Sequence, residues 1–178
     1  MSPGELDRPA FVAALKACGA LQFGTLTLAS GKTSSYYIDI KRAITRPELL
    51  QTMAAAMAPF TRAVDRIAGV ELGAVPLAAA VSLASGKPYL MVRREAKGHG
   101  TKKDFEGDLA PGDRVLLVED VVTTGGTLRV AVERLRAHGA AMEDVVAVVD
   151  REEGGAANLA SIGMKLHALL RARDLLSF

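Results

Sequence analysis

The sequence predicts one α/β domain over residues 1–178, with a central, mainly parallel sheet flanked by helices. Several short runs are apolar at consecutive positions, which is typical of strands covered on both faces. These runs are residues 67–71, 89–93, 115–120 and 145–150. The first three are separated by a helical stretch or a long loop, and this alternation favours a parallel sheet.

The N-terminal segment is expected to form a small additional unit, called the hood here. Residues 11–20 have the spacing of a short amphipathic helix. Residues 21–28 and 34–40 are predicted to be two strands around a Ser-Gly-Lys turn. Pro47 suits the first turn of a further helix over residues 48–63. We therefore expect the hood to cover about residues 1–45 and the alternating pattern to follow it.

Residues 94–108 interrupt the alternation and predict a long mobile loop. They contain three glycines and have no apolar periodicity beyond Phe105. Long loops within compact domains are usually functional. Six cationic or ionisable residues fall within eleven positions, with Glu95 as the only acid: Arg93, Arg94, Lys97, His99, Lys102 and Lys103. The loop is therefore expected to meet an anion, although a solvated run of surface charges is the alternative.

Composition excludes several classes of function. With 49% hydrophobic residues, 24% charged residues and a net charge of +2, the chain resembles an ordinary globule. This charge is too small for a general attraction to nucleic acid or membranes. Cys18 is the single cysteine, and no apolar targeting segment begins the sequence, so we expect a cytoplasmic protein. His138 and His167 are interpreted as structural residues, and no protein-borne transition-metal site is expected.

The segment from Val115 to Thr127 carries the functional prediction. A buried strand is expected to end at Glu119-Asp120, followed by a Thr/Gly-rich loop and a helix that ends near Gly139. The N-terminus of such a helix binds anions, and its glycines let backbone N–H groups approach a phosphate. Adjacent carboxylates accept hydrogen bonds from paired sugar hydroxyls. An ordinary strand-to-helix turn would explain any one of these residues, whereas the whole run indicates a ribose 5-phosphate site.

This run resembles the phosphoribosyl-pyrophosphate motif of the type I phosphoribosyltransferases. Three further segments are similar to parts of the orotate phosphoribosyltransferases. Residues 93–100 resemble their flexible catalytic loop. Residues 28–39 resemble their N-terminal orotate segment, and residues 150–153 resemble their base-contacting segment. The likeness spans most of the chain and implies the type I phosphoribosyltransferase fold.

The resemblance also implies a reaction and a set of site residues. The family joins N1 of orotate to C1 of phosphoribosyl pyrophosphate, giving orotidine 5'-monophosphate and pyrophosphate. Lys97, His99 and Asp120 would be catalytic. The phosphoribosyl-pyrophosphate-binding residues would be Arg93, Arg94, Lys97, His99, Glu119, Asp120, Val121, Val122, Thr123, Thr124, Gly125, Gly126 and Thr127. The orotate-binding residues would be Thr123, Arg151, Tyr36 and Tyr37.

The implied partners are small molecules and a second copy of the chain. Mg²⁺ would arrive on the oxygens of the diphosphate substrate, with no metal ligand from protein side chains. The resemblance implies a homodimer in which the catalytic loop serves a shared active site. Lys102 and Lys103 are more typical of surface charges.

Departures from the family pattern leave alternatives open. Many relatives carry lysine where this chain has Ala29 and Gly73. A phosphoribosyltransferase for another base is one alternative, which Arg151 and the Tyr36-Tyr37 pair oppose. A ligand-sensing regulator on the same fold is another, but the chain has no room for an added DNA-binding domain. Arg151 could instead be a structural residue that pairs with a neighbouring glutamate.

Overall fold

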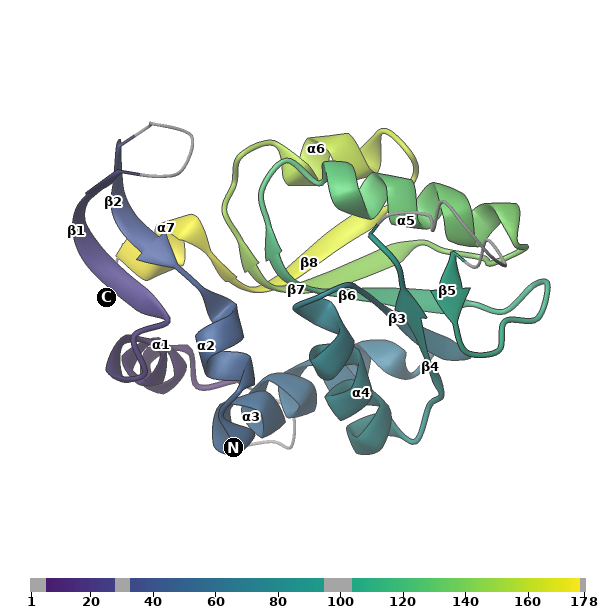
Figure 1. Ribbon diagram of the computed structural model, residues 1–178, viewed down its shortest axis with the longest axis horizontal. Helices are drawn as coiled ribbons and strands as arrows, with labels where there is room; N and C mark the ends of the chain where they lie inside the picture. Colours follow the sequence, from purple (N-terminus) through teal and green to yellow (C-terminus); the bar gives the residue numbers. More distant parts are fainter. Residues whose placement is uncertain (1–5, 28–32, 95–103, 177–178) are drawn as a thin grey trace.

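A computed structural model describes residues 6–27, 33–94 and 104–176 (Figure 1). Its main sheet has six strands in the order β5-β4-β3-β6-β7-β8. Only β5 runs antiparallel to its neighbour. The strands are β3 (Arg66–Val70), β4 (Tyr89–Val92), β5 (Phe105–Glu106), β6 (Val115–Val122), β7 (Asp144–Asp150) and β8 (Lys165–Arg171). The predicted α/β class with a mainly parallel sheet is confirmed.

Helices cover both faces of this sheet (Figure 1). One face packs against α2 (Ile40–Ile44), α3 (Pro47–Met57), η1 (Ala58–Thr61) and α4 (Ala74–Ser85), and the other against α5 (Gly126–Ala137) and α6 (Gly155–Ala160). Alternation along β6 sends Leu116 into the first layer and Leu117 into the second, and both are fully buried. None of the helices in the described part is long and apolar enough to cross a membrane.

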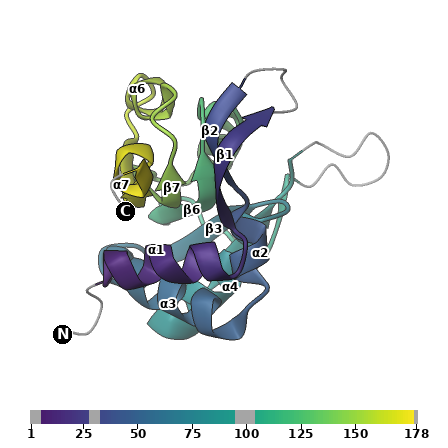
Figure 2. The same ribbon diagram turned by 90° about the vertical axis from the view of Figure 1, so that its left-hand side faces the viewer.

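The hood lies at one end of the molecule, and Figure 2 views the molecule from that end. It contains α1 (Arg8–Ala17) and an antiparallel pair formed by β1 (Leu21–Thr27) and β2 (Thr33–Ile38). The C-terminal helix α7 (Ala172–Leu176) follows β8. The helix α1 begins before the predicted residue 11 because Asp7 caps it, accepting a 3.0 Å hydrogen bond from the Ala10 N–H.

Several boundaries differ from those that the sequence predicts. The strand β6 continues two residues beyond Asp120, because Val121 and Val122 pair with β7. The predicted second hood strand ends earlier, and Ile40 begins a helix instead. Phe105 and Glu106, predicted to lie in the mobile loop, form β5 against β4. Residues 95–103 of that loop, including Lys97, His99, Lys102 and Lys103, lie outside the described residues.

Candidate active site

A cavity of about 400 Å³ lies at the carboxyl ends of β3 and β6. This is the edge of an open parallel sheet at which ligands bind. Its lining comes from α2, the β3–α4 connection, the end of β4 and the segment from β6 into α5. The lining residues are Lys41, Val70, Glu71, Leu72, Gly73, Arg94 and residues 119–128. Ten residues of the predicted phosphoribosyl-pyrophosphate set, Arg94 and residues 119–127, are therefore brought together here.

The loop from Thr123 to Thr127 forms the floor of a potential phosphate site. Gly125 has φ +76°, a left-handed conformation that favours glycine, and Gly126 then begins α5. The helix has twelve residues and no acidic residue in its first turn, so its amino end presents N–H groups without a competing carboxylate. This arrangement suits an anion such as a phosphate.

Residues of the helix α6 hold this loop in place through two close contacts. The Asn158 side-chain amide donates a 2.8 Å hydrogen bond to the carbonyl of Thr124. Gly155 allows close approach, since a Cβ there would lie 2.6 Å from the Thr123 carbonyl oxygen. Sequence reasoning did not identify either residue, because the contact joins segments about thirty positions apart and neither segment has a recognisable motif of its own.

Glu119 and Asp120 form the polar wall of the cavity from within β6. They are only 9% and 8% exposed. A Glu119 carboxylate oxygen accepts a 2.8 Å hydrogen bond from the Asp120 N–H, and Asp120 Oδ1 accepts one of 2.9 Å from the Val121 N–H. Burial raises the pKa of Glu119 well above its usual value, and the hydrogen bond and negative charge of Asp120 raise this pKa further.

Two residues beside Asp120, Gly73 and Lys41, were not predicted to contact its side chain. Gly73 provides space, because a Cβ at that position would lie 2.4 Å from Asp120 Oδ2. Lys41 provides charge, with its Nζ 3.5 Å from the same oxygen. Lys41 comes from α2, just beyond the second strand that the sequence predicts for the hood. The contact depends on tertiary packing and has no local sequence signal.

The two predicted arginines at the start of the basic loop have different surroundings. Arg94 lines the cavity. Arg93 instead pairs with Glu106 at 2.8 Å and approaches Glu71 at 4.0 Å, which ties β5 to β4 and to the β3–α4 connection. Arg134 on α5 donates to the carbonyls of both arginines, at 3.0 and 3.4 Å. The backbone of Arg93 and Arg94, where the basic loop begins, is therefore held against α5.

Of the predicted orotate residues, Thr123 is the one in the described cavity lining, and Arg151 lies beside Tyr36. Thr123 lines the cavity, and the Arg151 N–H donates to the Val122 carbonyl at 2.9 Å. The Arg151 guanidinium lies 5.5 Å from the ring centroid of Tyr36, which is buried, whereas Tyr37 is 41% exposed. Arg151 also pairs with Glu153 at 2.8 Å, which is the ion pair expected if Arg151 is a structural residue. Its Nε is buried with no hydrogen-bond partner among the described atoms.

The two described histidines have structural partners, as the sequence predicts. His138 Nε2 lies 3.0 Å from Asp104 Oδ2, and the ring packs edge-on against Phe105. His167 Nε2 lies 2.7 Å from Asp144 Oδ1 and packs against Phe60. Over residues 6–27, 33–94 and 104–176, no three His, Cys, Asp or Glu side chains form a group that could hold a metal ion.

Comparisons with known proteins agree on one family. A family model described as a phosphoribosyl transferase domain matches residues 43–162. An orotate phosphoribosyltransferase from Methanosarcina mazei is 51% identical over 174 residues, covering 97% of this chain and 93% of that protein. The crystal structure of orotate phosphoribosyltransferase from Aeropyrum pernix matches with a TM-score of 0.84 at 33% identity, covering 94% of this chain and 96% of that one.

A third relative was solved with a ligand. The Mycobacterium tuberculosis orotate phosphoribosyltransferase, in complex with 5-phospho-α-D-ribosyl 1-diphosphate, matches with a TM-score of 0.78 at 29% identity. The match covers 96% of this chain and 99% of that one.

The raised pKa of Glu119 predicts a pH-dependent stability. Between the ordinary glutamate pKa and the raised value, the folded chain keeps a proton that the unfolded chain has lost. Stability therefore falls as pH rises through this window. Glu119→Gln removes that titration, so urea unfolding of the variant should depend less on pH than unfolding of the wild type.

Glu143→Gln, at an exposed position, is the matched control and should keep the wild-type pH dependence. If Glu119→Gln also follows the wild-type curve, the folded chain does not hold this proton.

Proposed function

We propose that this chain, which belongs to the orotate phosphoribosyltransferases within the phosphoribosyl transferase domain family, joins N1 of orotate to C1 of phosphoribosyl pyrophosphate. The products are orotidine 5'-monophosphate and pyrophosphate, in pyrimidine synthesis. The observation that carries the proposal is the nearly buried Glu119-Asp120 pair, which shares one cavity with the glycine-rich helix N-terminus that follows it along the chain.

The cavity supplies complementary groups for the sugar phosphate. The N–H groups of residues 123–127 and the amino end of α5 bind the 5-phosphate. Asp120 and Glu119 accept hydrogen bonds from the ribose hydroxyls. Together these contacts hold C1 at a defined position, which converts the encounter with the base into an oriented reaction.

The leaving group needs positive charge. As the C1–O bond breaks, C1 becomes electron-poor, pyrophosphate takes the bonding electrons, and N1 of orotate donates the pair that forms the new bond. Arg94 lines the cavity where this charge develops. Lys97 and His99, which follow it along the chain, act on the pyrophosphate, with His99 donating a proton or hydrogen bond.

Mg²⁺ enters this scheme as part of the diphosphate substrate. The ion is held by diphosphate oxygens and waters, with no ligand from a protein side chain. The ion neutralises charge on the diphosphate, and the protein residues orient the sugar and the base.

The single cysteine suits the cytoplasm as the location of this reaction.

The base is recognised by Arg151, Tyr36, Tyr37 and Thr123. The planar Arg151 guanidinium can form paired hydrogen bonds with the carboxylate or imide edge of orotate. Tyr36 holds the guanidinium from one side, and Glu153 is nearly half exposed, so that its pair with Arg151 can be exchanged for substrate. This contact favours orotate over bases that have no acidic group.

The direct test is turnover followed by ultraviolet absorbance. With Mg²⁺ and phosphoribosyl pyrophosphate, the chain should consume orotate and release pyrophosphate. Adenine and xanthine serve as competing bases. Turnover of either purine without orotate turnover would assign the chain to another base, and binding of the ligands without any turnover would favour a sensing role.

Arg151→Ala should weaken the binding of orotate and leave the binding of phosphoribosyl pyrophosphate unchanged, because only the base loses a charged donor. Loss of a charge-assisted hydrogen bond costs about 1.5–3 kcal/mol, or roughly one to two decades in affinity. Titration calorimetry with each ligand measures the two affinities separately. Glu153→Gln is the control, since it breaks the same ion pair and keeps the guanidinium. If Arg151→Ala and Glu153→Gln weaken both ligands equally, Arg151 has a structural role only.

The basic loop is proposed to serve the active site of a partner subunit in a homodimer. Arg134 on α5 donates hydrogen bonds to the carbonyls of Arg93 and Arg94, so the loop begins at a fixed position. The proposal also draws on the similarity of residues 93–100 to the family's shared-site loop. Closure of such a loop excludes water and adds cations as the leaving group gains charge.

Subunit mixing tests this arrangement. Lys97→Ala and Asp120→Asn chains are each impaired, and subunits are then exchanged between them. If loops act across the dimer, each hybrid has one intact site, and activity should recover to about a quarter of the wild-type level at equal mixing. Absence of recovery after confirmed exchange would mean that each loop serves its own subunit.

A further inference from the structure

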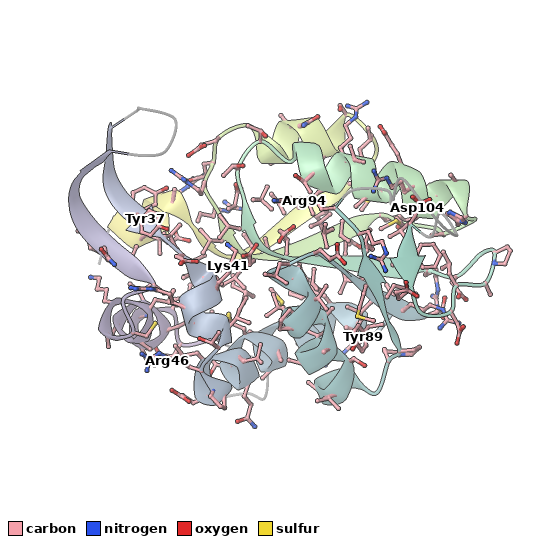
Figure 3. All side chains as sticks on the ribbon, in the orientation of Figure 1. Tyr37, Lys41, Arg46, Tyr89, Arg94 and Asp104 are labelled. Atoms are coloured by element: carbon pink, nitrogen blue, oxygen red, sulfur yellow. The ribbon has the colours of Figure 1, made fainter. Side chains whose placement is uncertain are left out.

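We propose that Lys41 is a further phosphoribosyl-pyrophosphate-binding residue, whose ammonium group holds the Asp120 carboxylate beside the ribose. This inference rests on the proposed function and deepens it, since it assigns part of the sugar site to the hood. Lys41 lies on α2, and Asp120 lies on the central strand β6 (Figure 3 labels Lys41).

The contact is made by a well-positioned lysine. Ile40 and Ala43 are fully buried and Ile44 is 6% exposed, so α2 is fixed on the core by one face. Lys41 leaves the helix on another side, with 60% of its side chain exposed, and its Nζ reaches within 3.5 Å of Asp120 Oδ2. The Asp120 side chain is only 12% exposed. The pair therefore joins a solvated cation to a nearly buried carboxylate at the cavity wall.

The lysine keeps hydrogen-bonding capacity for a substrate. Its other acidic neighbour is Asp39, 3.8 Å away. An ammonium group has three donors, and the cavity is lined by Lys41 itself. A ribose hydroxyl bound to Asp120, or a diphosphate oxygen beside it, would lie within reach of the same ammonium group.

On the opposite wall, Gly73 of the β3–α4 connection places no side chain beside Asp120. Asp120 Oδ2 occupies the space where a side chain at position 73 would start, with only 2.4 Å to a Cβ built there. Among the described residues that line the cavity, Lys41 and Arg94 are the cations, against the carboxylates of Glu71, Glu119 and Asp120. Lys41 therefore supplies part of the positive charge that a diphosphate meets in the described lining.

The test is a double-mutant cycle on Lys41 and Asp120. Lys41→Ala should raise the KM for phosphoribosyl pyrophosphate about tenfold, because a partly exposed charge-assisted contact is lost, and leave the KM for orotate unchanged. Lys41→Arg should recover most of the loss, whereas Lys41→Gln should not. In the Asp120→Asn background, Lys41→Ala should have an effect of less than about threefold, because the two residues act together.

Lys165→Ala is the matched control, an exposed lysine at the start of β8, and should leave both KM values at the wild-type level. Urea midpoints check that each variant folds, and Lys41→Gln keeps a polar side chain without the charge if Lys41→Ala is destabilised. A wild-type KM for phosphoribosyl pyrophosphate in Lys41→Gln would overturn the proposal. So would a Lys41→Ala effect of equal size in the wild-type and Asp120→Asn backgrounds.

Calorimetry with phosphoribosyl pyrophosphate and Mg²⁺, without orotate, separates this proposal from the proposed function. Weaker binding to Lys41→Ala than to the wild type supports the role of Lys41 whichever base is used. If orotate is turned over normally and Lys41→Ala binds the sugar diphosphate as tightly as the wild type, only the Lys41 proposal fails.

Discussion

Two adjacent carboxylates held nearly out of water, Glu119 and Asp120, constrain the design of the whole site. Burying such groups is costly unless they gain hydrogen bonds, a proton or an opposite charge. The chain uses all three: backbone N–H groups donate to both residues, burial raises the pKa of Glu119, and Lys41 faces Asp120. The strand β6, paired on both sides, keeps them at the cavity wall.

Glycines determine the shape of the site as much as the charged residues do. Gly73 leaves space for the Asp120 carboxylate, and Gly155 lets α6 approach the phosphate loop. Gly125 adopts the left-handed conformation that turns the chain from β6 into α5. Among the described lining residues, the cations come from different elements, Lys41 from α2 and Arg94 from the segment after β4. The binding surface is thus assembled from four separate parts of the chain around one strand end.

The sequence predicts those features whose residues are contiguous. The apolar runs identify β3, β4, β6 and β7, and the segment 119–127 stays together as one cavity wall because it is a single strand, loop and helix start. Lys41, Asn158 and Gly155 were not found, because each acts through a contact with a distant segment. The extension of β6 and the two-residue β5 likewise depend on neighbouring strands, which no local pattern reveals.

We propose that the 119–127 segment binds ribose by its carboxylates and the 5-phosphate by its glycine-rich loop. A crystal structure with phosphoribosyl pyrophosphate and Mg²⁺ tests it most directly. We expect the 5-phosphate at the N–H groups of residues 123–127 and the ribose hydroxyls on Glu119 and Asp120. A sugar phosphate bound elsewhere, with this loop making no contact with it, would rule out this role for the segment.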